Sequence, residues 1–170
     1  SFRAKYKSNG GTIQLINSDK SKIKEMIVDG KQVSPSNSYL FNDTLEHKVF
    51  MLLDMNISLN SMFQRIDRMI SISFTRFFNT SKAYNMSYMF EFCSSLIYIN
   101  VSNFDTSNAS NMEGIFADCS SLKSIDVSNF NTSKVIEMAG MFADCLSLTS
   151  INVSNFVTSN AINIYSMFYN

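Results

Sequence analysis

Three cysteines have the clearest chemical potential in the chain, because thiolates can bind metals, attack substrates or form disulfides. Cys93, Cys119 and Cys145 lie 26 residues apart. No Cys-x-x-Cys pair or neighbouring histidine completes a metal-ligand pattern. An odd number of cysteines also cannot pair completely within one chain. We therefore expect three small buried side chains in the core, with no metal and no disulfide framework.

The other reactive residues form no catalytic pattern. His47 is the single histidine, and no Ser or Cys nucleophile motif surrounds it, so we expect a structural role. The carboxylates of the second half do not recur as a pair at one position, and the five glycines are too dispersed for a phosphate-binding loop. The sequence therefore predicts a protein that is not an enzyme and uses no cofactor.

The charge and length of the chain argue against several classes of protein. Its 170 residues carry 14 basic and 14 acidic side chains, a balance unlike that of nucleic-acid-binding proteins. No apolar run approaches the ~18 residues of a transmembrane segment. Residues 1–82 carry 12 basic and 7 acidic side chains, whereas residues 83–170 carry 2 and 7. Opposite charges at the two ends can attract copies of the chain head to tail.

The second half of the chain repeats with a period of 26 residues, which predicts a solenoid of about four units over residues 61–170. A degenerate first copy begins at Met62-Phe63 and is one residue longer. The array stops inside a unit at Asn170, so we expect it to be truncated at this end. The positions that recur are Met89-Phe90, Ile115-Phe116, Met141-Phe142 and Met167-Phe168, then Cys93, Cys119 and Cys145, then Leu96, Leu122 and Leu148, then Phe104, Phe130 and Phe156.

Each unit contains two apolar patterns. Leu96, Ile99 and Val101 follow the L-x-x-L-x-L spacing of leucine-rich repeats and alternate with polar residues, which favours a half-buried strand. The next apolar residues fall at i, i+3, i+4 and i+7, the spacing of one face of a short helix. These are Met112, Ile115, Phe116 and Cys119. The predicted fold is therefore an α/β solenoid, with a parallel sheet on one side and short helices on the other.

A ladder of threonines precedes the predicted helices, at Thr80, Thr106, Thr132 and Thr158. A hydroxyl group at this place can accept a hydrogen bond from the first turn of a helix, so we expect these residues to be N-caps. A regular threonine ladder could instead bind a surface lattice such as ice, but N-capping explains the position better.

The repeat unit resembles that of the BspA-like leucine-rich-repeat surface proteins, which reads roughly C-S-S-L-x-x-L-D-L-S-N-F-D-T-S-N-V-T-N-M-x-x-M-F. Here residues 93–116 read CSSLIYINVSNFDTSNASNMEGIF and residues 119–142 read CSSLKSIDVSNFNTSKVIEMAGMF. The resemblance covers residues 62–170, with Ile136 and Glu137 as departures. It implies an extracellular or cell-surface protein of bacteria or protists that acts in adhesion or protein–protein contact, without enzymatic activity.

Residues 1–60 do not repeat, and we expect them to form a small β-rich cap on the N-terminal edge of the solenoid sheet. A hairpin is predicted around Gly10-Gly11, and a turn at Asp29-Gly30. The predicted strands are Phe2–Lys7, Thr12–Ile16, Lys22–Val28 and His47–Asp54.

The outward positions of the predicted strands are the candidate binding surface, which we call the strand face. Its residues are Tyr98, Asn100, Ser102, Ser124, Asp126, Ser128, Ser150, Asn152 and Ser154. Asn100, Asp126 and Asn152 could alternatively form a hydrogen-bonded ladder of purely structural value. Small polar side chains make weak single contacts, so we expect binding through multivalency. The expected partner is a protein, from a host or another copy of this chain, or a surface glycan. The alternative function is a structural subunit that assembles head to tail into a filament.

Asn-x-Ser/Thr sequons are frequent in the chain. They are either glycosylation sites of a secreted eukaryotic protein or a by-product of a composition rich in Asn and Ser. They begin at Asn42, Asn56, Asn79, Asn85, Asn100, Asn108, Asn131 and Asn152.

Overall fold

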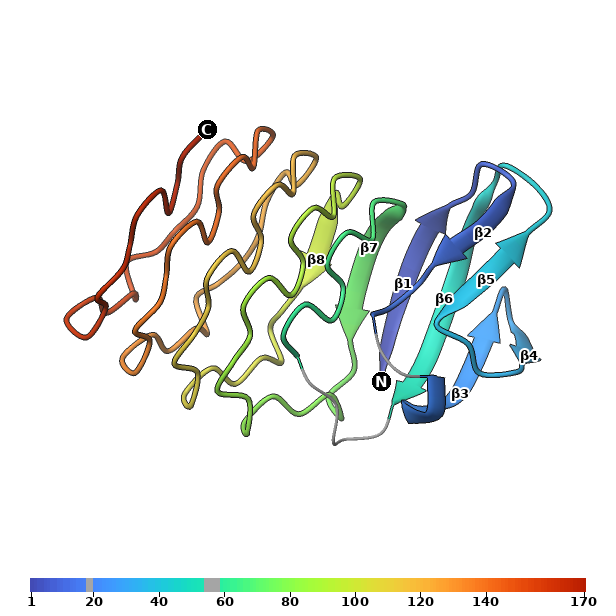
Figure 1. Ribbon diagram of the computed structural model, residues 1–170, viewed down its shortest axis with the longest axis horizontal. Coiled ribbons are helices and arrows are strands. Elements are labelled where there is room, and N and C mark those ends of the chain that lie inside the picture. The colour runs from blue at the N-terminus through green and yellow to red at the C-terminus, as the bar shows by residue number, and fades with distance from the viewer. Residues whose placement is uncertain (18–19, 54–58) are drawn as a thin grey trace.

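The computed structural model describes residues 1–17, 20–53 and 59–170. A twisted sheet forms one end of the molecule, and successive coils of the chain stack side by side from the sheet to the C-terminus (Figure 1). The predicted modules 1–60 and 61–170 share this sheet, because strands from both pair within it.

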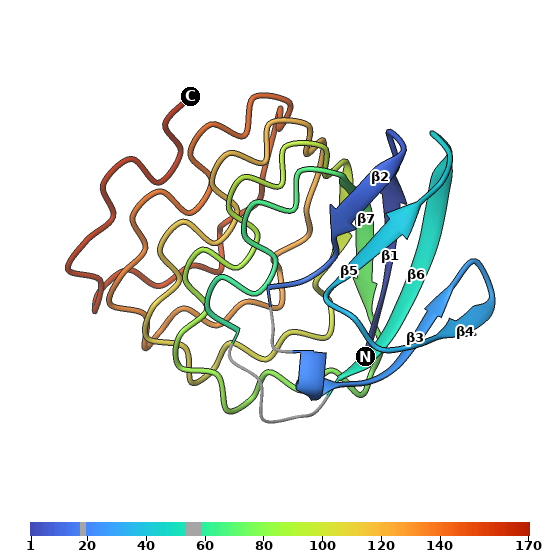
Figure 2. The same cartoon turned by 45° about the vertical axis from the view of Figure 1, so that its right-hand side comes forward.

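The main sheet has six strands in the order β4-β3-β6-β1-β7-β8. All neighbours are antiparallel except β7 and β8, which run parallel. A second, two-stranded sheet, β2-β5, crosses in front of it in Figure 2. The strands are β1 (Phe2–Lys7), β2 (Gly11–Gln14), β3 (Ile23–Val28), β4 (Lys31–Val33), β5 (Ser38–Phe41), β6 (Glu46–Leu53), β7 (Met69–Phe74) and β8 (Tyr98–Asn100), with a 3-10 turn at Lys20–Lys22.

Alternation of side chains explains why these segments form half-buried strands. In β1, Phe2, Ala4 and Tyr6 are buried while Arg3 and Lys7 are exposed, as the two-residue period of a strand requires. The Tyr6 hydroxyl donates to the carbonyl oxygen of Leu15 at 2.7 Å, which satisfies its polar end within the core.

The predicted hairpin around Gly10-Gly11 does not form, so this prediction is wrong. The turn exists, with φ of 73° and 134° at the two glycines, but β1 pairs with β6 and β7 while β2 pairs with β5. Because both edges of β1 are occupied, β2 has to find its partner elsewhere. The turn at Asp29-Gly30 is confirmed, since β3 and β4 form an antiparallel hairpin there.

The α/β solenoid with short helices, predicted from the leucine-rich-repeat spacing, is also wrong. No α-helix occurs in the described part of the chain, whose regular structure is nearly all β. The predicted helical stripes lie in turns, where alternate backbone N–H groups donate to the next coil: Tyr88 to Glu113, Phe90 to Ile115, and Phe92 to Ala117, at 2.8–2.9 Å. A helix would satisfy these groups internally, so the two arrangements exclude each other.

Left-handed residues replace the helices. Tyr88 and Phe92 have φ of 58°, and the residues one coil later, Gly114 and Asp118, have 56° and 57°. Each left-handed residue interrupts the run of negative φ values that an α-helix requires. Apolar side chains three and four residues apart can therefore point inward without a helix.

The predicted parallel sheet is also shorter than expected. Within the described residues β8 is the last strand, and the strand side of the following units carries one isolated bridge, between Tyr98 and Ser124. The turn-rich side carries further bridges, including Asn111 with Glu137 and Glu137 with Asn163.

The core is a column of stacked phenylalanines. The rings of Phe63, Phe90, Phe116, Phe142 and Phe168 follow one another at centroid distances of 5.3–5.7 Å and nearly parallel planes. Phe2 meets Phe63 edge to face at 5.0 Å. The core of the coils is therefore continuous with that of the sheet.

Candidate functional site

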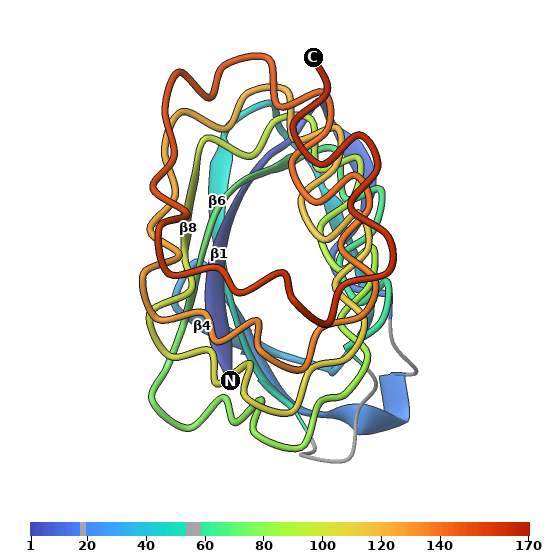
Figure 3. The same ribbon diagram turned by 90° about the vertical axis from the view of Figure 1, so that its left-hand side faces the viewer.

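The strand face lies on the outer side of the coils. Eight of its nine residues are exposed, and Asn100 is half-buried. Viewed along the stack, β6, β1 and β8 lie in one wall and the turn-rich segments in the opposite wall (Figure 3). The surface of the strand face therefore continues that of the main sheet.

The alternative ladder of Asn100, Asp126 and Asn152 does not form. Each side-chain oxygen accepts a hydrogen bond from the backbone N–H two residues on, at 3.0, 2.9 and 3.0 Å. These are Asx turns, which close the chain locally. Hydrogen bonds from the side chain and the backbone of Ser128 also lower the pKa of Asp126. The three oxygens thus serve their own coil and not a ladder between coils.

Asx turns also account for most of the sequons. The side-chain oxygen of the asparagine accepts the N–H two residues on in five of them, Asn79, Asn85, Asn100, Asn131 and Asn152. In each case the N–H belongs to the Ser at the third position of the sequon. Asn56 lies outside the described residues. The frequency of the motif therefore has a structural cause that is independent of glycosylation.

A second set of asparagines joins neighbouring coils and was missed from the sequence. The Asn129 amide nitrogen donates to the carbonyl oxygens of Val101 and Phe104 at 3.1 and 2.8 Å. Asn155 repeats this contact one coil later. The recurrence of Asn before Phe every 26 residues was the available signal.

The threonine ladder does not cap helices, so that prediction is wrong. The Thr106 hydroxyl donates to the Asn131 carbonyl oxygen at 3.1 Å and accepts the Asn131 N–H at 2.8 Å. Thr80 and Thr132 make the same pair of bonds. Because these three side chains are buried, they cannot present hydroxyl groups to an external lattice.

Cys93, Cys119 and Cys145 are buried, which confirms their predicted position in the core. The thiols of Cys93, Cys119 and Cys145 donate to the phenylalanine carbonyl of the preceding coil at 3.0–3.2 Å. Burial raises the pKa of Cys93 to about 12 and of Cys145 to about 11. Because the thiolate is the reactive form, these thiols are poor nucleophiles.

His47 lies between two carboxylates. Its Nδ1 is 2.7 Å from Asp29 and its Nε2 is 2.9 Å from Asp43, and its ring stacks on Phe41 at 4.0 Å. Burial by itself lowers the pKa of His47, but hydrogen bonds and charge from Asp29 and Asp43 outweigh it and raise that pKa. The imidazolium thus ties together the turn after β3 and the loop before β6.

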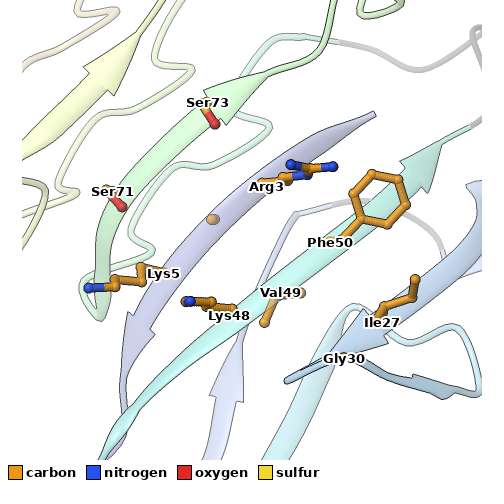
Figure 4. A pocket seen from close by; sticks show the side chains of 10 residues that line it. Arg3, Lys5, Ile27, Gly30, Lys48, Val49, Phe50, Ser71 and Ser73 are labelled. Carbon is orange, nitrogen blue, oxygen red and sulfur yellow. The ribbon is translucent and has the colours of Figure 1, made fainter.

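A groove lies on the outer face of the main sheet, beside the strand face. We call it the basic groove; its volume is about 430 Å³. Figure 4 shows Arg3, Lys5 and Lys48 extending along β1 and β6. The sequence signal was the alternation of Arg3, Lys5 and Lys7 in β1, to which β6 adds Lys48. The lining residues are Arg3, Ala4, Lys5, Ile27, Gly30, Lys48, Val49, Phe50, Ser71 and Ser73.

The strand register connects the basic groove to the strand face. Lys48 lies opposite Lys5, Lys5 opposite Ser71, Ser71 opposite Tyr98, and Tyr98 opposite Ser124. Their side chains share the outer side of the sheet because paired residues point the same way. The two surfaces are therefore one continuous face.

Within the described residues, no group of three or more His, Cys, Asp or Glu side chains is arranged to hold a metal ion. The same part of the chain contains no helix with the length and apolar character of a membrane span.

No curated protein and no solved structure matches the chain. A family model described as "Mycoplasma protein of unknown function, DUF285" matches residues 57–170, more than half of the chain. The match includes the 26-residue units, whereas Arg3, Lys5 and Lys48 of the basic groove lie outside it. The chain therefore belongs to the DUF285 family.

Proposed function

We propose that this protein is a non-enzymatic, extracellular or cell-surface repeat protein that mediates adhesion or protein–protein contact through the strand face. The observation that carries the proposal is the regular exposure of equivalent side chains in successive coils, such as Ser124 and Ser150. Backbone hydrogen bonds in the turn-rich segments join each coil to the next, as from Phe90 to Ile115 and from Phe116 to Met141. A rigid periodic surface gains strength from many weak contacts.

Kinship with the BspA-like surface proteins is part of this proposal. It is supported by the order of recurring residues in the segments 93–116 and 119–142. The kinship concerns the repeat sequence and the surface location, and it does not include the helices of leucine-rich repeats.

Site-specific cross-linking tests the proposed surface. A photoreactive amino acid replaces Tyr98, Ser124 or Ser150, and each variant is incubated with intact cells and with cell lysate. Tyr84 provides the matched control, because it is 71% exposed but lies outside the strand face. We expect one discrete cross-linked partner from the strand-face positions and none from position 84. Equal products from all positions, or none from the strand face, contradict the proposal.

A second candidate function is head-to-tail self-assembly. The last coil exposes Ile162, Tyr165 and Tyr169 by 78, 80 and 64%. Phe142 and Phe168 are among the residues that line a pocket of about 200 Å³ at this end of the stack. In such an assembly the acidic half of one copy, residues 83–170, would meet the basic half of the next copy, residues 1–82.

Sedimentation velocity at low and high salt tests this candidate. We expect species that grow with concentration at low salt and dissociate at high salt, since salt screens the opposite charges. Tyr165→Ser removes apolar contact and reduces assembly, whereas Tyr84→Ser leaves it unchanged. A monomer at every concentration and salt level excludes self-assembly.

A further inference from the structure

The basic groove has a charge arrangement that folding alone does not favour. Lys5 and Lys48 are directly opposite each other on antiparallel strands, where like charges are destabilising. Arg3 adds a third cation two residues along β1. Glu46 pairs with Lys5 at 2.7 Å on the surface. Among the described residues, neither the Arg3 guanidinium nor the Lys48 ammonium group forms an ion pair with a carboxylate.

The groove also has an apolar side. Phe50 and Ile27 are half-buried, lie opposite each other on β6 and β3, and line the groove. The Arg3 guanidinium lies over the Phe50 ring, 5.9 Å from its centroid. In Figure 4 the apolar side chains lie toward β3 and the ammonium groups lie toward β7. A ligand that covers both parts therefore needs an anionic group close to an apolar group.

Hydroxyl groups complete the far side of the groove. Ser71 and Ser73 lie opposite Lys5 and Arg3 on β7, and each can donate to a carboxylate or to a backbone carbonyl. The same rows continue to Tyr98 and Asn100 on β8. A bound extended segment that follows the rows thus passes from the groove onto the strand face.

We propose that the basic groove binds an acidic protein segment, with a carboxylate held by Lys5, Lys48 and Arg3 and a neighbouring apolar side chain placed against Phe50 and Ile27. The proposal rests on the proposed function, since it assigns a chemistry to the partner of the strand face. A sulfated or phosphorylated polyanion fits less well, because it leaves the apolar side uncovered. The three cations of the groove and the Glu46 carboxylate also leave only a small net positive charge, which a few carboxylates of the segment are enough to neutralise.

Fluorescence anisotropy with synthetic probes tests the partner chemistry. The main probe is a labelled peptide of alternating Glu and Leu, compared with a Gln-Leu peptide, a Lys-Leu peptide and a sulfated heparin oligosaccharide. We expect binding of the Glu-Leu peptide alone, weakening as salt increases. Equal binding of the Gln-Leu peptide overturns the role of charge. Preferential binding of the oligosaccharide overturns the protein partner.

Substitution of Lys48 tests the site. Lys48→Gln is expected to weaken binding of the Glu-Leu peptide about tenfold, while the melting temperature stays the same or rises because the repulsion from Lys5 is removed. Lys48→Arg should keep the affinity. Lys123→Gln removes an exposed charge outside the groove and serves as the control. Unchanged binding by Lys48→Gln, or the same loss in Lys123→Gln, overturns the assignment.

Cross-linking from the strand face separates the two proposals. If a partner is captured from Tyr98 but Lys48→Gln changes neither that capture nor peptide binding, the groove assignment fails and the proposed function stands. If the peptide binds through Lys48 but no partner is captured from Tyr98, Ser124 or Ser150, the proposed function fails and the groove assignment stands.

Discussion

Single polar side chains hold neighbouring coils together. Thr106 is 1% exposed, and its hydroxyl both donates to and accepts from the backbone of Asn131. Thr158 is the equivalent residue of the last unit and is exposed. Burial of a polar group is costly unless it is hydrogen-bonded, so the same residue type has different energetic weight at the two positions.

Thr106→Val should destabilise the protein by about 1–3 kcal/mol, because the isosteric valine leaves the backbone groups of Asn131 without their partner. Thr158→Val should change the unfolding free energy by less than about 0.5 kcal/mol, as surface substitutions generally do. Urea unfolding measures both. Equal losses in the two variants would show that the bonds between coils are not the cause.

The paired carboxylates of His47 make stability dependent on pH. The pKa of His47 is raised in the folded protein. The stabilisation that His47 provides is therefore complete at pH values below its unfolded pKa of about 6.5, and it is lost as the pH rises through its folded pKa. At Asp29, burial raises the pKa but hydrogen bonds from His47 and Lys48 outweigh it, so that pKa is lowered. The pKa of Asp43 is also lowered, mainly by the hydrogen bond from the Leu45 N–H and further by His47. Both carboxylates therefore stabilise the folded protein at pH values above their unfolded pKa of about 3.9. This stabilisation is lost as the pH falls through their folded pKa values.

His47→Gln should therefore lower the unfolding free energy more at pH 5 than at pH 8.5. Chemical denaturation at the two pH values measures the difference. Lys134→Gln, at an exposed residue bonded to Asn108, is the control and should show no such dependence. A loss from His47→Gln that is independent of pH would mean that the ring contributes through its stacking on Phe41 alone.

Turns that contain a left-handed residue replace the helices in each unit. Gly114 and Gly140 have φ of 56° and 61°, where an alanine is strained by about 1 kcal/mol. Their surroundings differ. A Cβ at Gly114 would lie 2.8 Å from the Tyr88 ring, whereas a Cβ at Gly140 has its nearest neighbour at 3.8 Å, on Ala143.

Gly114→Ala should therefore cost more stability than Gly140→Ala, although both share the backbone strain. Thermal unfolding of the two variants measures the difference. In a Tyr88→Ser background, the cost of Gly114→Ala should fall to that of Gly140→Ala because the ring is gone. If the two alanine variants are equally stable when Tyr88 is present, the ring contact has no energetic weight.

At the scale of the whole molecule, the phenylalanine column makes the coils interdependent. Phe116 is fully buried between Phe90 and Phe142, whereas Phe168 at the end of the column is 48% exposed. Each coil contacts mainly its neighbours, so an internal defect weakens two interfaces at once.

Phe116→Ala should destabilise the protein by about 3–5 kcal/mol through loss of burial and formation of a cavity. Phe168→Ala should cost clearly less, because the ring is already partly in water. Guanidinium unfolding followed by far-UV circular dichroism measures both. A similar cost for the two would indicate that the column does not transmit stability along the stack.

The extent of successful prediction differs between the core and the hydrogen bonds. The inward direction of Cys93, Cys119 and Cys145 and of the phenylalanines follows from recurrence, since positions one period apart share an environment. The hydroxyl of Thr106 was expected at a helix, because its partner lies on another coil and is invisible in the local sequence. The basic groove was missed for a similar reason. Its cations come from β1 and β6, which are distant in the chain.

The sequence by itself determined the 26-residue period, the residues that point into the core and the opposite charges of the two halves. Only the tertiary structure decided between helices and turns, because spacings of three and four residues between apolar side chains suit both. The choice depends on where the backbone N–H groups find their acceptors. In this protein the acceptors lie on the next coil, as in the bond from Phe90 to Ile115, and no local pattern of side chains specifies a partner 25 residues away.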